Sequence, residues 1–369
     1  MQSVPPGELR FGNAAEIPEF DATRYFDLKE TGFLDPFAQY GVVAGREALA
    51  DAGVEWTAEL RENSAIVTGS ALGGKSTEDE GYKQYYALKS TRFNPLTIPR
   101  AMANAVASRL TLELGVTGPA YTMATACSSS NHAIGHAFWM VRNGSAEMAI
   151  AGGSEAVFSV GILHAWEAMR VVAPDTCRPF SKERKGLILG DGGAMLVLEP
   201  LEAAQARGAH IYAEIAGFGM SADAHHITQP LPEGAARAMR AALRDGELAP
   251  EQVQYINAHG TGTPANDSTE TAAIRSVFGA HADKLAVSST KSMHGHTLGA
   301  AGAIEAAATI LAMMRGFIPP TVNYCTPDPA CDLDVVPNHG RPAQIECALS
   351  NSFAFGGLNA VLAFRVLPV

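Results

Sequence analysis

The sequence predicts a layered α/β fold with a duplicated core. Short apolar runs that end in small residues alternate with amphipathic stretches, which is the pattern of buried strands between helices. The first half has four such runs, and they correspond in order to four runs in the second half. No low-complexity linker separates the halves, so we expect one compact unit made of an N-terminal half, residues 1–205, and a C-terminal half, residues 206–369.

The expected strands of the first half are residues 65–69, 121–124, 148–153 and 194–199, and those of the second half are 253–258, 285–289, 348–352 and 360–364. In each half the second strand runs directly into a small-residue turn and a helix, at residues 126–130 and 291–296. This shared order favours an active site between the halves. Coincidence stays open as an alternative, because any alternating α/β chain can be aligned in this way.

The composition excludes several classes of protein. A chain of 369 residues that is 47% hydrophobic can bury a large core, so it is neither disordered nor fibrous. Its net charge of −11 gives no global attraction to nucleic acid or to anionic membranes. The first residues show no basic segment before an apolar run, and no uninterrupted apolar stretch reaches the ~18 residues of a membrane span. We therefore expect a soluble, cytoplasmic protein that binds neither nucleic acid nor membrane.

The cysteines indicate free thiols rather than disulfides or a metal site. Their number is odd, and they lack the paired close spacing of a zinc ribbon or a redox motif. They are Cys127, Cys177, Cys325, Cys331 and Cys347. A reducing compartment and no bound metal are the expectation.

Cys127 is the candidate nucleophile. It lies where an expected strand ends and a helix begins, because residues 128–131 suit a first turn and residues 133–141 are mainly apolar. Unpaired backbone N–H groups at a helix start lower the pKa of a thiol and can bind a developing oxyanion. A lone cysteine is more often an inert core residue, so position alone leaves that alternative open.

Two histidines follow expected strands of the second half. His259 ends one strand and precedes a loop of glycines with Thr261 and Thr263, whose hydroxyls can bind a polar ligand chain. His296 opens a helix rich in small residues. His294 lies on the other side of a glycine and cannot easily reach the same cleft, so we favour His296 as the functional residue. A structural role for His259 stays open on this pattern alone.

Together these segments resemble the elongating β-ketoacyl-acyl carrier protein synthases of the thiolase superfamily. Residues 125–129 (Thr-Ala-Cys-Ser-Ser) look like the nucleophile motif, and residues 259–263 (His-Gly-Thr-Gly-Thr) look like the first histidine motif. Residues 291–302 look like the second histidine motif, and residues 351–357 (Asn-Ser-Phe-Ala-Phe-Gly-Gly) look like the gating loop. The resemblance runs from about Phe20 to Val366, and four motifs in the same order speak against coincidence.

The resemblance implies a thiolase-like fold with layers α-β-α-β-α and 3-oxoacyl-[acyl carrier protein] synthase activity, in fatty acid or polyketide-type chain elongation. Cys127 would take an acyl group from a carrier-protein thioester, and malonyl-carrier protein would then lose carbon dioxide. The resulting enolate would attack the Cys127 thioester in a decarboxylative Claisen condensation. No cofactor is implied, because phosphopantetheine arrives on the carrier protein.

The resemblance also implies residue roles. His259 and His296 would stabilise the enolate, and the backbone N–H groups of Cys127 and Phe355 would form the oxyanion hole. Lys291, paired with Glu305, would hold the histidine site electrostatically. The other implied roles are phosphopantetheine binding by Thr261 and Thr263, gating and acyl-pocket lining by Phe353, Phe355 and Leu72, and carrier docking by Arg92, Arg170 and Lys89.

Two partners are implied, an acyl carrier protein and a second copy of the chain. In the resembled family a strand and the acyl pocket meet at a two-fold interface. A carrier protein is acidic, so a chain of net charge −11 attracts it only through a local basic rim. Ordinary solvated surface charge stays open as the alternative for these basic residues.

The sequence departs from the family pattern in its first residues. Family members open with a buried strand that ends Thr-Gly-Leu-Gly, which we expect at the centre of the first sheet, and this sequence has no such segment before Phe20. A misassigned start codon and a truncated paralogue are both open. Leu358 and His294 each replace a customary threonine, and residues 29–33 are less basic than the family's stretch before Asp35.

Other functions compete with the condensing enzyme. A non-condensing partner of the chain-length-factor type typically lacks the nucleophilic cysteine, which this sequence retains. A thiolase needs a second catalytic cysteine, and a priming synthase needs an asparagine where His296 stands. A cysteine hydrolase finds no matching motif. The remaining alternative is a non-condensing partner subunit or a truncated inactive paralogue.

Overall fold

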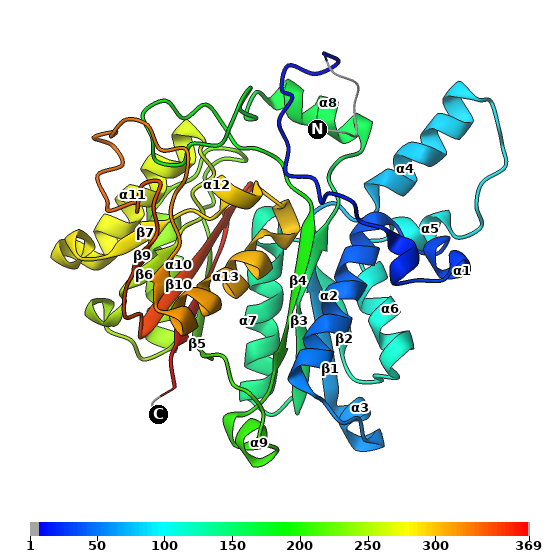
Figure 1. Ribbon diagram of the computed structural model, residues 1–369, viewed down its shortest axis with the longest axis horizontal. Coiled ribbons are helices and arrows are strands. Elements are labelled where there is room, and N and C mark those ends of the chain that lie inside the picture. Colours follow the sequence, from blue (N-terminus) through cyan, green and yellow to red (C-terminus); the bar gives the residue numbers. More distant parts are fainter. Residues whose placement is uncertain (1–6, 368–369) are drawn as a thin grey trace.

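Two β-sheets form the framework of the molecule, with helices between them and on both outer faces (Figure 1). The structure, a computed structural model, describes residues 7–367. The first sheet has the order β2-β1-β3-β4, with β1 (Ser64–Gly69), β2 (Ala120–Met123), β3 (Met148–Glu155) and β4 (Gly192–Leu198). The second has the order β5-β11-β10-β6-β7, with β5 (Glu214–Ala222), β6 (Tyr255–Asn257), β7 (Ala286–Ser288), β10 (Cys347–Ala354) and β11 (Leu358–Arg365). A separate small ribbon pairs β8 (Phe317–Ile318) with β9 (Arg341–Pro342).

Six helices complete the layers. Helices α7 (Ser129–Arg142) and α13 (Ala301–Arg315) lie between the sheets. Helices α2 (Pro36–Ala52) and α6 (Ala105–Leu114) cover the outer face of the first sheet. On the outer face of the second sheet, α10 (Pro232–Asp245) packs on β5 and β11, and α11 (Pro264–Phe278) packs against α10. The predicted α-β-α-β-α layering is therefore confirmed.

The remaining helices lie in the connections between these elements. The α-helices among them are α1 (Leu28–Thr31), α3 (Ala58–Asn63), α4 (Lys75–Tyr82), α5 (Thr97–Ala101), α8 (Val160–Met169), α9 (Leu201–Ala206) and α12 (Lys291–His294). The single-turn elements are η1 (Ala22–Arg24), η2 (Lys83–Ala87), η3 (Ala126–Ser128), η4 (Pro250–Gln252), η5 (Gly279–Asp283) and η6 (Leu298–Ala300).

Helix α2 shows how local sequence sets these elements. Asp35 precedes it as N-cap, and the Asp35 carboxylate accepts a hydrogen bond from the Phe37 N–H. Pro36 occupies the first turn, where its missing N–H costs nothing. At the other end Gly53 adopts φ 59°, a left-handed conformation that glycine reaches without strain. The helix between these caps buries an apolar face against β3 and β4.

The two sheets repeat one topology, as the sequence predicts. In each, three strands are parallel and the next is antiparallel: β2, β1 and β3 then β4, and β7, β6 and β10 then β11. All eight expected strands are present. The expected four-to-four match is wrong in one respect, because the second sheet has a fifth strand, β5, beside β11. Its sequence, Glu-Ile-Ala-Gly-Phe-Gly-Met-Ser-Ala, mixes glycines and polar residues and forms no continuous apolar run.

A second expectation places the segment missing before Phe20 at the centre of the first sheet. It stays a prediction, because no part of residues 7–367 forms that segment. The strand of the second sheet that lacks a counterpart among residues 7–367 is β5, and β5 is an edge strand. The corresponding edge of the first sheet is β4. A cavity of about 470 Å³ runs along that edge, lined by β4, α2, α7 and the segment that leads into β5.

One helical stretch within residues 7–367, Leu298–Arg315, is long and apolar enough to cross a membrane by length and composition. Of this stretch 61% is buried inside the protein. Its residues Ala303, Ile310 and Met313 belong to the apolar core between the sheets, and a buried core helix has this same composition.

Candidate active site

Cys127 lies in a sharp turn between a strand and a helix. Strand β2 ends at Met123, the turn η3 holds Cys127, and α7 begins at Ser129. Ala126, immediately before the cysteine, has φ 50°, a left-handed conformation that costs a non-glycine residue roughly 1–3 kcal/mol. The turn places Cys127 at the N-terminal end of α7, as predicted, and leaves it 6% exposed.

A close backbone approach fixes this turn against the first sheet. A Cβ atom added to Gly69, at the end of β1, would lie 2.5 Å from the Ser130 nitrogen. Only glycine therefore allows the end of β1 to touch the start of α7. The strand end thus supports the nucleophile's helix directly.

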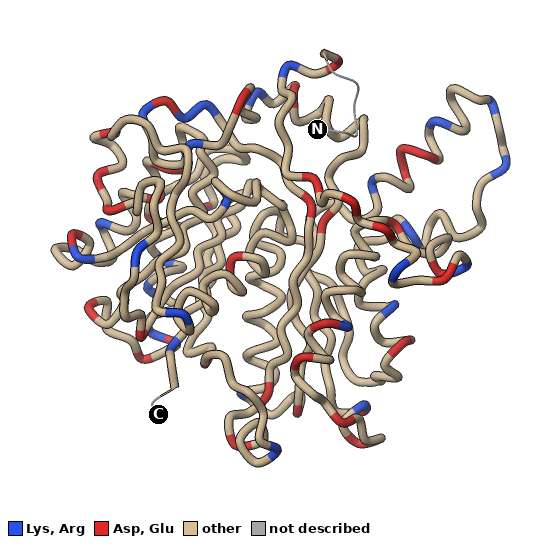
Figure 2. Tube along the Cα trace, in the orientation of Figure 1, with Lys and Arg blue, Asp and Glu red and all other residues tan. Residues whose placement is uncertain are grey.

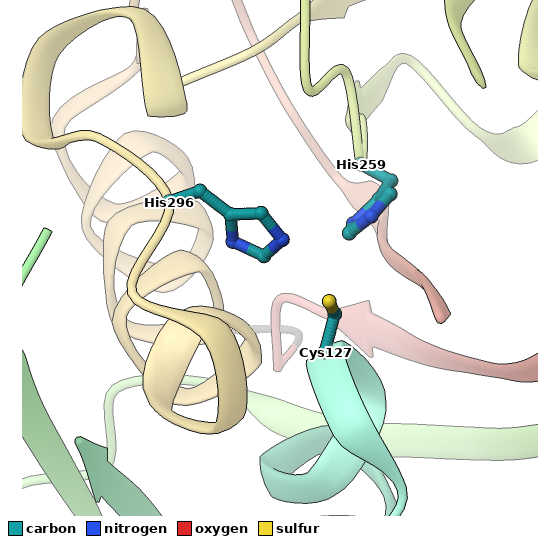
Figure 3. Close-up of side chains that lie close together, drawn as sticks. All are labelled: Cys127, His259 and His296. Atoms are coloured by element: carbon teal, nitrogen blue, oxygen red, sulfur yellow. The ribbon is translucent and has the colours of Figure 1, made fainter. Parts of the chain in front are cut away.

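His259 and His296 meet Cys127 from the C-terminal half. One ligand atom of each residue, the cysteine sulfur and one ring nitrogen of each histidine, lies within 4.8 Å of the other two. Figure 3 shows both rings standing over the sulfur from different loops. The two ring centroids are 5.4 Å apart, with planes at 83°. The predicted convergence of Cys127, His259 and His296 is present.

A buried carboxylate holds the His259 loop. Glu270, on α11, accepts hydrogen bonds from the His259 N–H at 2.9 Å and the Gly260 N–H at 2.8 Å. The Asn351 amide donates to the same carboxylate at 3.1 Å. Glu270 was not predicted from the sequence, since an acidic residue in the middle of a helix usually faces solvent. The only signal is its place on the buried side of α11.

His296 is held through its backbone. Its N–H donates to the Ile188 carbonyl at 2.6 Å, and its carbonyl accepts from the Gly190 N–H at 3.0 Å. Residues 188–190 precede β4, so a segment of the N-terminal half fixes a histidine of the C-terminal half. His294 instead contacts the Thr290 hydroxyl at 3.1 Å and does not line the active-site cavity, as predicted.

Lys291 and Glu305 form the predicted ion pair. Both side chains are fully buried, and the Lys291 ammonium donates to a Glu305 carboxylate oxygen. Burial raises the pKa of Glu305 to about 7, and the charge of Lys291 opposes that rise. The charge of Lys291 acts on all three candidate residues, because it lowers the pKa of Cys127, of His259 and of His296.

Both catalytic candidates among the histidines are neutral near neutral pH. Burial and then the positive charge of Lys291 lower the pKa of His259 and of His296 well below the ordinary value. A neutral imidazole has one N–H that can donate to a developing enolate oxygen.

The thiol departs from one expectation. We expected the helix start to lower the pKa of Cys127, but burial outweighs it and raises this pKa to about 12. The charge of Lys291 and the backbone N–H groups of Phe355 and Cys127 oppose that rise. The same two N–H groups are the ones predicted for the oxyanion hole.

Models of two families match this chain. The beta-ketoacyl synthase N-terminal domain matches residues 9–204, and the beta-ketoacyl synthase C-terminal domain matches residues 212–325. The chain belongs to the beta-ketoacyl synthase family. These enzymes are condensing acyltransferases, so the alternative of a non-condensing subunit is not favoured.

Curated relatives and a solved structure agree with this assignment. Nodulation protein E of Rhizobium sp. (strain N33) is 48% identical over 349 residues, covering 95% of this chain and 86% of the relative. The 3-oxoacyl-[acyl-carrier-protein] synthase 2 of Staphylococcus aureus is 42% identical over 359 residues, covering 95% and 89%. A type II PKS acyl-carrier protein in complex with its ketosynthase gives a TM-score of 0.88 at 31% identity, covering 97% of this chain and 89% of that one. The thiolase-like fold predicted for the synthase is confirmed.

A cavity of about 480 Å³ leads to the cysteine of the synthase. Predicted site residues that line it are Cys127, His259, His296, Thr261, Thr263, Phe353 and Phe355. Leu72 does not line this cavity but belongs to the same apolar cluster as Cys127. The Trp166 ring stacks on Phe355 with the ring centroids 6.2 Å apart. Trp166 and residues 226–230 also line the cavity and were not predicted. Neither carries a motif that the residues alone would reveal.

The predicted docking residues lie in two places. Arg170 is exposed and follows Met169, which lines the cavity. Lys89 and Arg92 are exposed on the projecting arm, which we define as residues 75–101 (Figure 1). Neither residue of the arm lines the cavity.

The spacing of Cys127, His259 and His296 also suits a metal ion, because three ligand atoms within 4.8 Å of one another can share one cation. The surroundings favour an anion instead. Lys291 and the backbone N–H groups of Cys127 and Phe355 stabilise negative charge at the sulfur. That the site works without a metal stays a prediction.

Proposed function

We propose that this synthase condenses malonyl-carrier protein with an acyl group held on Cys127, and releases 3-oxoacyl-carrier protein and carbon dioxide. The observation that carries the proposal is the convergence of the Cys127 sulfur with one ring nitrogen each of His259 and His296. The relatives' family supports the same reaction class. We further propose that it works in the cytoplasm and needs no cofactor besides carrier-borne phosphopantetheine, a view supported by the free cysteines among the described residues.

The first half-reaction is acyl transfer. The Cys127 sulfur attacks the thioester carbon of the acyl-carrier protein while the thiol proton passes to a neighbouring neutral imidazole. The two events occur together, because burial raises the pKa of the thiol and lowers the pKa of both imidazoles. The backbone N–H groups of Cys127 and Phe355 hold the oxyanion that forms. The bond from that carbon to the phosphopantetheine sulfur breaks, and the leaving thiolate takes the proton back from the imidazole. Cys127 now carries the acyl group as a thioester.

The second half-reaction begins with loss of carbon dioxide from malonyl-carrier protein. The electron pair of the breaking carbon–carbon bond moves into an enolate, whose oxygen accepts hydrogen bonds from the N–H groups of His259 and His296. The enolate carbon attacks the acyl carbon on Cys127, and the bond from that carbon to the cysteine sulfur breaks. The cysteine leaves as thiolate and takes up one proton from solvent, which restores the thiol for the next cycle. Thr261 and Thr263, whose hydroxyls lie 2.9 Å apart on the cavity wall, are placed to bind the phosphopantetheine chain.

A direct assay tests this proposal. The synthase is given acyl-carrier protein and malonyl-carrier protein labelled at the free carboxyl group. We expect labelled carbon dioxide and one equivalent of 3-oxoacyl-carrier protein by mass spectrometry. Hydrolysis of the acyl-carrier protein without a new carbon–carbon bond would contradict the proposal. A series of acyl chains in the same assay gives the preferred length.

Carrier docking by basic residues can be tested by charge reversal. Arg92 and Arg170 are exposed, and Figure 2 shows basic residues on the projecting arm. We expect Arg92→Glu and Arg170→Glu to raise the KM for acyl-carrier protein and to flatten its dependence on ionic strength, since each contact contributes about 1 kcal/mol. A short pantetheine thioester should be nearly unaffected. Equal losses with both substrates would show that the arginines support the fold or the active site.

We also propose that the synthase is a homodimer. Strand β2 is an edge strand of the first sheet, and the projecting arm exposes several large apolar side chains. Those on the arm are Tyr82, Tyr85, Tyr86, Leu88, Phe93 and Ile98. Exposed apolar side chains gathered on one segment mark an interaction surface.

Light scattering at micromolar concentration tests the dimer. We expect a mass of twice the 38.7 kDa of one chain. The double variant Tyr85→Glu/Tyr86→Glu should shift the mass toward that of a monomer, because charges would be buried at the interface. A wild-type mass of one chain would contradict the dimer.

A further inference from the structure

Glu155 is a buried carboxylate that the mechanism above does not use. It ends β3, it is fully buried, and no ion pair to it is present among residues 7–367. Four donors satisfy its two oxygens instead. Oε1 accepts from the Ser70 hydroxyl at 3.0 Å and the Leu72 N–H at 3.2 Å. Oε2 accepts from the Ala71 N–H at 2.6 Å and the Gly299 N–H at 3.0 Å.

These donors come from two segments that meet only in the folded chain. Residues 70–72 follow β1 directly, in the N-terminal half. Gly299 belongs to η6, three residues after His296, in the C-terminal half. Oε2 therefore bridges one N–H from each half. In the part of the chain that the structure describes, Glu155 thus holds these segments together through four directed hydrogen bonds to a carboxylate, and not through an ion pair.

The two segments also touch each other. A Cβ atom added to Gly299 would lie 2.3 Å from the Ala71 nitrogen and 2.5 Å from Oε2 of Glu155. Glycine at this position is therefore required for the approach. Within residues 7–367 no other hydrogen bond links Gly299 to residues 70–72, so the hydrogen-bonded connection between the two segments depends on the Glu155 carboxylate.

Both segments contact or adjoin residues of the active site. Leu72 and Leu298 pack in one apolar cluster with Cys127 and Phe355. Residues 188–190 hold the backbone of His296 itself. Glu155 holds η6, which begins two residues after His296, and so helps to fix the position of the His296 loop. A shift of about 1 Å at such a site can cost roughly 100-fold in rate.

We propose that Glu155 is a positioning residue that joins the Leu72 segment to the His296 loop, so that acyl transfer and malonyl decarboxylation both depend on its carboxylate. This inference rests on the proposed function, since it concerns the same two half-reactions. An amide cannot replace the carboxylate, because an NH₂ group would face N–H donors and leave at least one of them unsatisfied.

The test compares Glu155→Gln with a matched variant, Asp35→Asn. Asp35 is also a fully buried carboxylate of the N-terminal half and accepts three hydrogen bonds, from Phe37 and Thr77. None of these hydrogen bonds involves residues 70–72 or η6. Both variants are measured at a temperature where circular dichroism shows each to be folded. Decarboxylation is read in the Cys127→Gln background and acyl transfer in the Cys127 form, with a short and a long acyl chain.

For Glu155→Gln we expect kcat of both half-reactions to fall about 10- to 100-fold, with a changed ratio between the short and long chains and an unchanged KM for the carrier protein. Asp35→Asn should lower the melting temperature but leave both half-reactions near wild type. If Glu155→Gln behaves like Asp35→Asn, the carboxylate only stabilises the fold and the inference is wrong.

Two further results keep the inference distinct from the proposed function. If the parent protein itself neither becomes acylated nor decarboxylates malonyl-carrier protein, the proposed function fails. If the parent performs both and Glu155→Gln matches it, only the inference about Glu155 fails. Should Glu155→Gln not fold, Ser70→Ala removes a single donor to the carboxylate, and we expect a smaller loss in both half-reactions together. A loss in neither would contradict the inference.

Discussion

Cys127→Gln abolishes condensation while malonyl decarboxylation continues. The substitution removes the sulfur that accepts the acyl group, so we expect condensation to fall by roughly 10⁴-fold or more. His259 and His296 stay in place to stabilise the enolate. The glutamine carbonyl can occupy the oxyanion hole formed by the Cys127 and Phe355 N–H groups in the position of a thioester oxygen. Release of carbon dioxide and formation of 3-oxoacyl product are measured in the same reaction.

Cys331→Ala is the matched control, because Cys331 is also buried but packs in the core of the C-terminal half. Its condensation rate should stay near wild type. Adding His296→Ala to Cys127→Gln should stop the decarboxylation. A Cys127→Gln protein that still forms 3-oxoacyl product would show that another group carries the acyl chain.

Lys291→Met strongly destabilises the synthase. The substitution leaves the Glu305 carboxyl buried without its ion-pair partner, and breaking such a pair costs about 3–5 kcal/mol of unfolding free energy. The pKa of Glu305 is already raised to about 7, above the ordinary 4.5, and it rises further without Lys291. The folded state then binds a proton that the unfolded state releases. Stability of the variant therefore falls as pH rises from about 5 to 8.

Denaturant unfolding at pH 6 and pH 8 measures this effect. The double variant Lys291→Met/Glu305→Gln should recover much of the loss and should remove its pH dependence, since neither position of the pair then carries an ionisable group. Lys291 also lowers the pKa of both histidines, so its loss should shift the acid limit of decarboxylation to higher pH. Equal stability of Lys291→Met and wild type at both pH values would contradict this account of the pair.

The sequence predicts the architecture well because its main signals are local. Buried strands appear as short apolar runs, and all eight that we expected are present. Strand β5 was not predicted, because its sequence forms no apolar run. Its glycines instead allow close packing on α10. A Cβ at Gly219, for example, would lie 2.2 Å from the Ala238 carbonyl oxygen. Such a contact cannot be read without the position of the helix.

The candidate site also has a part that the sequence predicts and a part that it does not. The reacting groups stand in short motifs at strand ends, so Cys127, His259 and His296 can be found from the chain. Their supports cannot, because Glu155 and Glu270 act through backbone N–H groups on other segments. Gly299 lies 144 residues from Glu155 in the chain. Only the fold brings such pairs together, and an isolated acidic residue gives no sign of it.

The central claim is that Cys127 carries the acyl group. The most direct measurement is peptide mapping by mass spectrometry after the synthase is incubated with acyl-carrier protein alone. We predict an added acyl mass on the peptide that contains Cys127, lost on treatment with hydroxylamine or on addition of malonyl-carrier protein. An adduct on Cys177, Cys325, Cys331 or Cys347, or none on a protein that still condenses, would contradict the claim.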